Sequence, residues 1–131
     1  MNICYIPEGK DYHFIKRSIK YLNEYGLSVT FIVKTKAASE QCKADGFSCY
    51  YVGEVYDSRN FISGDELHAL DIKYGPPSIG EICNADYYLD FLSKRQLSKE
   101  QIVGRTYRFW EKFFANFKVD YILSPNAPFF V

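Results

Sequence analysis

The sequence predicts a Rossmann-like α/β domain, a three-layer α/β/α arrangement around a parallel sheet of about four strands in the order 3-2-1-4. Strand-like and helix-like segments alternate from residue 2 with short connections, which favours parallel strands joined by right-handed crossovers. The segment 28–33 is apolar along most of its length, as strands buried on both faces of a sheet are. Aromatic residues form 18% of the 131 residues, so the chain can bury a core. We therefore treat residues 1–131 as one Rossmann-like domain.

Each element of this fold has its own signal in the sequence. Apolar runs bounded by turn residues predict four strands, at 2–6, 28–33, 48–52 and 119–123. Helical spacing and capping residues predict helices at 11–25, 36–45, 65–70 and from 98 to about 117, and residues 78–92 are expected to hold one or two more. In the first helix, Ile15, Ile19 and Leu22 repeat at i, i+4 and i+7. Asp11 is expected to cap its start and Gly26 to follow its end.

The helix that follows Ser98 carries the broadest apolar stripe. Ser98 followed three residues later by Gln101 predicts a capping box. The residues expected to face the core are Ile102, Phe109, Trp110, Phe113 and Phe117. The charged residues expected on the opposite side, in water, are Arg105, Arg108, Glu111 and Lys112.

Composition excludes several classes of protein. The 16 Lys and Arg residues balance 16 Asp and Glu residues, so no nucleic-acid partner is expected. No run approaches the roughly 18–20 apolar residues that a membrane-spanning helix needs, and the N-terminus lacks the basic region of a signal peptide. We therefore expect a cytoplasmic protein without a transmembrane segment.

The cysteines and glycines predict neither a metal site nor a resident cofactor. None of the four cysteines forms a C-x-x-C pair, and the chain has two histidines. We expect reduced thiols that pack as small apolar side chains. The loop Glu8-Gly9-Lys10 matches neither the P-loop nor the dinucleotide fingerprint G-x-G-x-x-G.

Two stretches resemble one family. Residues 2–46, with the phrase Leu22-x-x-x-Gly26-x-x-Val29-Thr30-Phe31, resemble the opening of a GT-B glycosyltransferase. Residues 57–128 include "DSRNF" and "FWEKFFANFKVDYILSPNAP", and they resemble bacterial capsular-polysaccharide biosynthesis proteins. The chain departs from the GT-B pattern because it stops after its fourth predicted strand. A GT-B enzyme has a second Rossmann-like domain that binds the nucleotide-sugar, so the resemblance implies a fragment or the N-terminal part of a two-domain protein.

The resemblance implies a function in capsule or surface-polysaccharide synthesis. The chain would be the acceptor-side domain, and the enzyme would transfer a sugar from a nucleotide-sugar to a hydroxyl of a carbohydrate acceptor. The missing domain would bind the donor, so we expect no glycosyl transfer by these residues alone. The resemblance implies an enzyme only where a second domain completes the chain.

The resemblance also points to candidate catalytic residues. His13 follows the first predicted strand, where several GT-B enzymes place the histidine that deprotonates the acceptor hydroxyl. An ordinary histidine pKa near ~6.5 suits a general base. Asp11 could orient His13 or act as the base itself. The alternative for His13 is an exposed histidine in a first helical turn, and for Asp11 a helix cap.

Substrate-binding candidates lie where predicted strands end, at the edge where α/β sheets usually bind ligands. In the first loop, Gly9 would let a ligand approach the backbone and Lys10 would meet an anion, unless the loop is a plain turn. Asp57 and Arg59 follow the third strand, with a surface ion pair as the alternative. Asn126 follows the fourth strand, with a polar turn residue as the alternative.

A different class of function also fits the sequence. The chain could be a non-catalytic flavodoxin-like or receiver-like module that binds a small molecule or a protein. A second Rossmann-like half encoded beyond residue 131 would favour the enzyme, and a stop codon would favour the module. In either case, the aromatic end Phe129-Phe130-Val131 and the open edge of the fourth strand predict a homodimer through residues 121–131.

Overall fold

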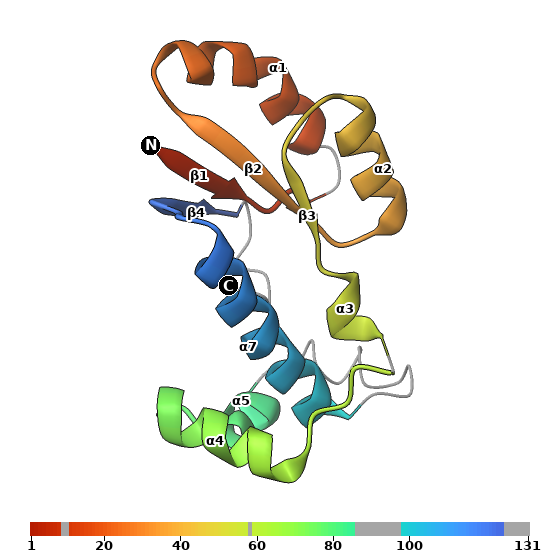
Figure 1. Cartoon of the computed structure of the whole chain (residues 1–131), viewed down its shortest axis with the longest axis vertical. Coiled ribbons are helices and arrows are strands. Elements are labelled where there is room, and N and C mark those ends of the chain that lie inside the picture. The colour runs from red at the N-terminus through yellow and green to blue at the C-terminus, as the bar shows by residue number, and fades with distance from the viewer. Residues whose placement is uncertain (9–10, 58, 86–97, 125–131) are drawn as a thin grey trace. The chain divides into compact units, whose positions relative to one another are not determined.

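A computed structural model describes residues 1–8, 11–57, 59–85 and 98–124 (Figure 1). The chain divides into two compact units, one formed by residues 1–53 and 114–131 and the other by residues 54–113. The strands are β1 (Asn2–Tyr5), β2 (Ser28–Val33), β3 (Cys49–Tyr51) and β4 (Tyr121–Leu123). The helices are α1 (Asp11–Glu24), α2 (Lys36–Ala44), α3 (Gly53–Tyr56), α4 (Gly64–Tyr74), α5 (Ile79–Ala85) and α7 (Lys99–Asn116).

The first unit contains the predicted sheet. Its four strands are all parallel and lie in the order β3-β2-β1-β4, which confirms the Rossmann-like class and the strand order 3-2-1-4. The topological switch point lies between β1 and β4, because β2 and β3 extend the sheet on one side of β1 and β4 extends it on the other. Gly26 and Gly46 end the first two helical segments with φ of 73° and 79°, a left-handed conformation that glycine adopts without a steric penalty.

One face of this sheet forms the core beneath α1 and α2 (Figure 1). The buried residues of this cluster are Ile3, Tyr5, Ile19, Val29, Phe31, Val33 and Cys42. Phe31 lies at its centre, with an exposed fraction of 0%. Its ring contacts the rings of Tyr5, Tyr12 and Phe47 at centroid distances of 6.1, 5.1 and 5.8 Å.

The opposite face of the sheet is covered as well. Cys4 and Ile32 point to this side and are buried. Tyr50, which pairs with Ile32 in the sheet, packs edge-to-face against Phe117 at 5.5 Å. Because Phe117 follows α7, the chain just beyond that helix lies on the face of the sheet that α1 and α2 leave free. This contact supplies the third layer of the fold.

The second unit is helical. The predicted helix at 65–70 extends to Tyr74, and Ser63 caps it in a full capping box with Glu66. Residues 79–85 form α5, and the rest of the stretch 86–92 predicted to be helical lies outside the described residues. In the described part of the chain, no helix combines the length and the apolar character that a membrane crossing requires.

The long helix α7 confirms part of its predicted pattern. Ile102, Phe109 and Phe113 are buried as expected, whereas Trp110 is half-buried and Phe117 is 36% exposed. The prediction that Arg105 faces water is wrong, because Arg105 is only 2% exposed. It lies three residues after Ile102 and four before Phe109, so helical geometry places it within the buried stripe.

An ion cluster between α1 and the end of α2 makes the first unit sensitive to acid. Lys16 approaches one carboxylate oxygen of Asp45 at 2.6 Å, and the Tyr12 hydroxyl donates a hydrogen bond to the other at 2.6 Å. Lys16, and then Tyr12, hold the pKa of Asp45 at about 2. An unfolded aspartate has a pKa near ~3.9, so the folded chain keeps Asp45 ionised where the unfolded chain would not.

The stabilisation that Asp45 supplies is therefore expected to be complete above about pH 4 and to disappear as the pH falls through about 2. Urea unfolding of the native chain and of the Asp45→Asn variant at pH 7, 4 and 2 measures it. The native chain should be the more stable at pH 7, and the difference should vanish at pH 2. A difference that is the same at every pH would contradict this assignment.

Candidate functional site

The carboxyl edge of the sheet in the first unit is the place where Rossmann-like domains bind ligands. Charged residues follow two of the strands at this edge. Glu8 follows β1 and Lys34 follows β2, and their side chains form an ion pair at 3.1 Å. Thr35 then caps α2 by accepting a hydrogen bond from the Ala38 N–H. The edge thus carries a paired acid and base between the starts of α1 and α2.

His13 and Asp11 lie in the first turn of α1, at this edge. The His13 side chain is exposed, and its ring packs edge-to-face against Tyr12 at 5.6 Å. Asp11 is the first residue of the helix, and its N–H donates a hydrogen bond to the Glu8 carbonyl at 3.2 Å. Burial, together with the negative charge of Asp11, raises the pKa of Tyr5. A solvent-facing imidazole therefore lies two residues after a carboxylate at the N-terminal end of a helix.

Not all the sequence-predicted site residues can be placed at this edge. Gly9, Lys10 and Asn126 lie outside the described residues. Asp57 and Arg59 belong to the second unit.

Asp57 and Arg59 bind each other. The Arg59 guanidinium donates two hydrogen bonds to the Asp57 carboxylate, at 3.0 and 2.8 Å, and the Arg59 N–H donates a third at 3.0 Å. Arg59 holds the pKa of Asp57 at about 2. An ionised, fully engaged carboxylate is a weak base, which favours a structural ion pair for these two residues.

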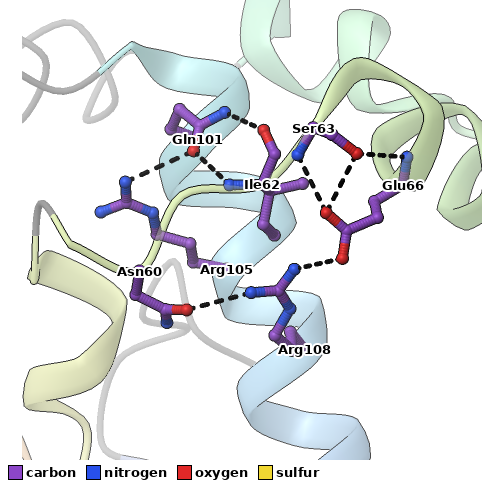
Figure 2. A network of polar contacts seen from close by, with 7 residues as sticks. All are labelled: Asn60, Ile62, Ser63, Glu66, Gln101, Arg105 and Arg108. Carbon is purple, nitrogen blue, oxygen red and sulfur yellow. Dashed lines mark hydrogen bonds and ion pairs between the residues drawn. The ribbon is translucent and has the colours of Figure 1, made fainter.

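Arg105 organises a polar network that the sequence patterns did not predict (Figure 2). Its guanidinium donates to the carbonyls of Val55 and Asp57, at 3.4 and 2.8 Å, and to the Gln101 side-chain oxygen at 3.3 Å. Gln101 in turn bonds both the N–H and the carbonyl of Ile62, at 2.9 and 2.6 Å. Only half of the predicted capping box is therefore seen: Ser98 accepts from the Gln101 N–H, but the Gln101 side chain is engaged with Ile62.

The buried guanidinium of Arg105 is costly to hold in place. Burial lowers its pKa, and its Nε has no hydrogen-bond partner among the described residues. Its hydrogen bonds tie α7 to Val55 in α3 and to Asp57 just after α3, whose carbonyl also accepts from the Asn60 N–H. The network is a structural clamp within the second unit.

A groove lies beside this network in the second unit. It has a volume of about 250 Å³ and is lined by Ile62, Glu66, Ala69, Leu70, Lys73, Arg108 and Glu111. Its charges are already paired: Arg108 binds Glu66 at 2.6 Å and Asn60 at 3.0 Å, and Lys73 binds Glu111. The groove therefore presents no unmatched charge to a ligand.

Comparison with models of known protein families, with curated proteins and with solved structures finds no match to this chain. Within the described ranges, no three His, Cys, Asp or Glu residues gather in a way that could hold a metal ion. The assignment of a function therefore depends on the geometry of the two units.

Proposed function

We propose that the chain is the acceptor-side domain of a GT-B-type glycosyltransferase that acts in capsule or surface-polysaccharide synthesis. The observation that carries the proposal is the exposed His13 in the first turn of α1, at the carboxyl edge of a parallel sheet with the order 3-2-1-4. The imidazole is open to a substrate, and the Asp11 carboxylate lies in the same turn of the helix. The resemblance of residues 2–46 to the opening of GT-B enzymes supports the same assignment.

In this proposal His13 is the general base. A ring nitrogen accepts the proton of an acceptor hydroxyl, and the hydroxyl oxygen forms a bond to the anomeric carbon of the donor sugar. The bond from that carbon to the phosphate oxygen breaks, and the nucleotide leaves with the electron pair. A second domain binds the nucleotide-sugar, and we place the reaction in the cytoplasm without a resident metal or cofactor.

A second candidate is a non-catalytic binding module. The observation that favours it is a set of exposed aromatic side chains on α1, namely Phe14, Tyr21 and Tyr25, because such residues are enriched in protein interfaces. The two candidates differ in what they require of His13. The enzyme needs its imidazole, whereas the module does not.

The test replaces His13 in the host's own gene and measures surface polysaccharide. A general base contributes about 10²–10⁴-fold to a rate, so His13→Ala should abolish most polysaccharide on immunoblots of cell extracts. Lys20→Ala changes an exposed residue of the same helix and is the matched control. Protein levels are compared by quantitative blotting. Normal polysaccharide in the His13→Ala strain, at normal protein level, would refute the catalytic role.

The purified chain provides the complementary arm. Because the donor domain is not part of these residues, the chain alone should release no nucleotide from any nucleotide-sugar, with a heat-treated sample as the blank. Release of nucleotide by the pure chain would contradict the proposal that a second domain binds the nucleotide-sugar.

A further inference from the structure

The outer flank of α1 carries a row of exposed aromatic side chains, which no residue of the described part of the first unit covers. Phe14, Tyr21 and Tyr25 are 72%, 63% and 83% exposed. Ser18 lies between them, so the row recurs at spacings of four, three and four residues. At 100° per residue, these four positions fall within an arc of roughly 60°. We call Phe14, Ser18, Tyr21 and Tyr25 the α1 stripe.

The contacts of α1 show which way this stripe faces. Tyr12 and Lys16 lie on the flank of α1 that binds Asp45, at the end of α2. The α1 stripe occupies the opposite flank by helical geometry, whereas Ile19 points into the core. The stripe therefore faces away from α2, toward the side of the sheet that β4 occupies.

The strand β4 extends this uncovered surface. Tyr121 pairs with Ile3 and Leu123 pairs with Tyr5, so both point to the face of the sheet that α1 covers. They are 56% and 46% exposed. The uncovered surface thus runs from the flank of α1 onto the neighbouring edge strand.

We propose that this surface binds a second copy of the chain, with the two α1 helices packed antiparallel about a two-fold axis. The spacing of the α1 stripe is the same in both directions along the helix. An antiparallel pair centred midway between positions 19 and 20 therefore places every stripe residue opposite another stripe residue. A surface that complements itself in this way is what a symmetric dimer requires.

The side chains that meet in this arrangement are complementary in size. Phe14 lies opposite Tyr25 of the partner subunit, which pairs two aromatic rings. Ser18 lies opposite Tyr21 of the partner subunit, so a small side chain leaves room for a large one. The two helix dipoles also run in opposite directions, which favours the antiparallel pair.

The charges that flank the stripe are complementary too. Arg17 and Glu24 lie on the same border of the stripe, and both are exposed. In the antiparallel register, Glu24 is level with position 15 of the partner subunit, about 3 Å along the axis from its Arg17. A parallel pair would instead hold Arg17 and Glu24 of the partner subunit about 10 Å apart along the axis, so that they would not pair.

The size of the surface sets the strength of the contact. An aromatic side chain buries about 150–250 Å², so the exposed parts of the three rings amount to roughly 400 Å² per copy. The two copies together bury less than the ~1,200–2,000 Å² of a stable complex, even before Tyr121 and Leu123 are added. An interface of this size is typical of weak, transient association, so we expect a weak dimer.

Sedimentation equilibrium of the full chain tests the proposal. The protein concentration should run from about 5 µM to about 1 mM, which covers the dissociation constants of weak dimers. The native chain should dimerise, and Tyr21→Glu should weaken the dimer at least about tenfold by placing a charge at its centre. Phe61→Glu is the matched control, because Phe61 is 67% exposed but lies in the second unit. It should change the dissociation constant less than about twofold. Circular dichroism confirms that both variants fold.

Three results would overturn the proposal. The first is a native chain that stays monomeric at about 1 mM, the upper end of weak association. The second is a dimer that Tyr21→Glu leaves intact. The third is an equal loss of dimer affinity in Tyr21→Glu and Phe61→Glu. The second of these would place the contact elsewhere, for instance at residues 121–131.

The orientation has its own test. Arg17→Glu should weaken the dimer several-fold, and adding Glu24→Arg should restore it, because the antiparallel register pairs these two positions. A dimer that Arg17→Glu leaves unchanged, or that adding Glu24→Arg does not restore, would overturn the antiparallel register.

Discussion

Replacing Arg105 with alanine is expected to lower the free energy of unfolding by about 3–5 kcal/mol. The side chain is 2% exposed and donates to the backbone carbonyls of Val55 and Asp57. Its removal takes the guanidinium donor from both carbonyls, of which Asp57 keeps only the Asn60 N–H, and also leaves a cavity. Urea unfolding followed by the fluorescence of Trp110, the single tryptophan of the chain and a member of the same helix, measures the loss.

Two further variants separate packing from hydrogen bonding at this position. Arg105→Met keeps most of the volume and removes the buried charge, so it should cost less than Arg105→Ala. Arg17→Ala removes an exposed arginine and should change stability by less than about 0.5 kcal/mol. An Arg105→Ala chain as stable as the Arg17→Ala chain would show that the clamp contributes little.

Replacing Phe31 with alanine is expected to cost about 3–5 kcal/mol in the first unit. Phe31 is fully buried, and three aromatic rings surround it, from β1, α1 and the segment before β3. The cavity would lie where α1 and α2 meet the sheet, so the helices cannot close it without moving off the strands. Thermal unfolding by circular dichroism measures the change.

Phe61→Ala is the control for this experiment, because Phe61 is exposed and lies outside the core of the first unit. It should shift the unfolding temperature little. If Phe31→Ala and Phe61→Ala unfold at the same temperature, this core does not stabilise the first unit as described.

The fold could be predicted because its signals are local. Apolar runs marked the four strands to within one or two residues, and alternation with helices was enough for parallel strands in the order 3-2-1-4. Gly26 marked the end of α1 because a left-handed residue there is best supplied by glycine. Signals of this kind need no knowledge of distant parts of the chain.

The second unit was harder to predict because its organising contacts join distant residues. Arg105 lies at helical spacing within the apolar stripe of α7, but its charge favoured a position in water. The carbonyls that it meets lie 48 and 50 residues earlier, in a segment without a repeating pattern. Helical spacing alone would have placed Arg105 in the core. A buried guanidinium needs hydrogen-bond acceptors, and these are brought to it only when the chain folds.

The candidate site was predicted in part. The position of His13 follows from the end of the first strand and the start of the first helix, both of which have local signals. The aromatic residues of α1 were visible in the sequence as well, but their exposure was not, because it depends on which flank of the helix α2 covers.

The measurement that tests the proposed function most directly is a titration of the isotope-labelled chain with oligosaccharides from the host's surface polysaccharide, followed by NMR. The account predicts that the His13 ring signals and the amide signals of residues 11–14 and 34–35 shift together and saturate. His13→Ala should weaken the binding, while Lys20→Ala should not. Shifts confined to the groove beside Arg108 in the second unit, with the His13 ring signals unmoved, would contradict the assignment of the sheet edge as the acceptor site.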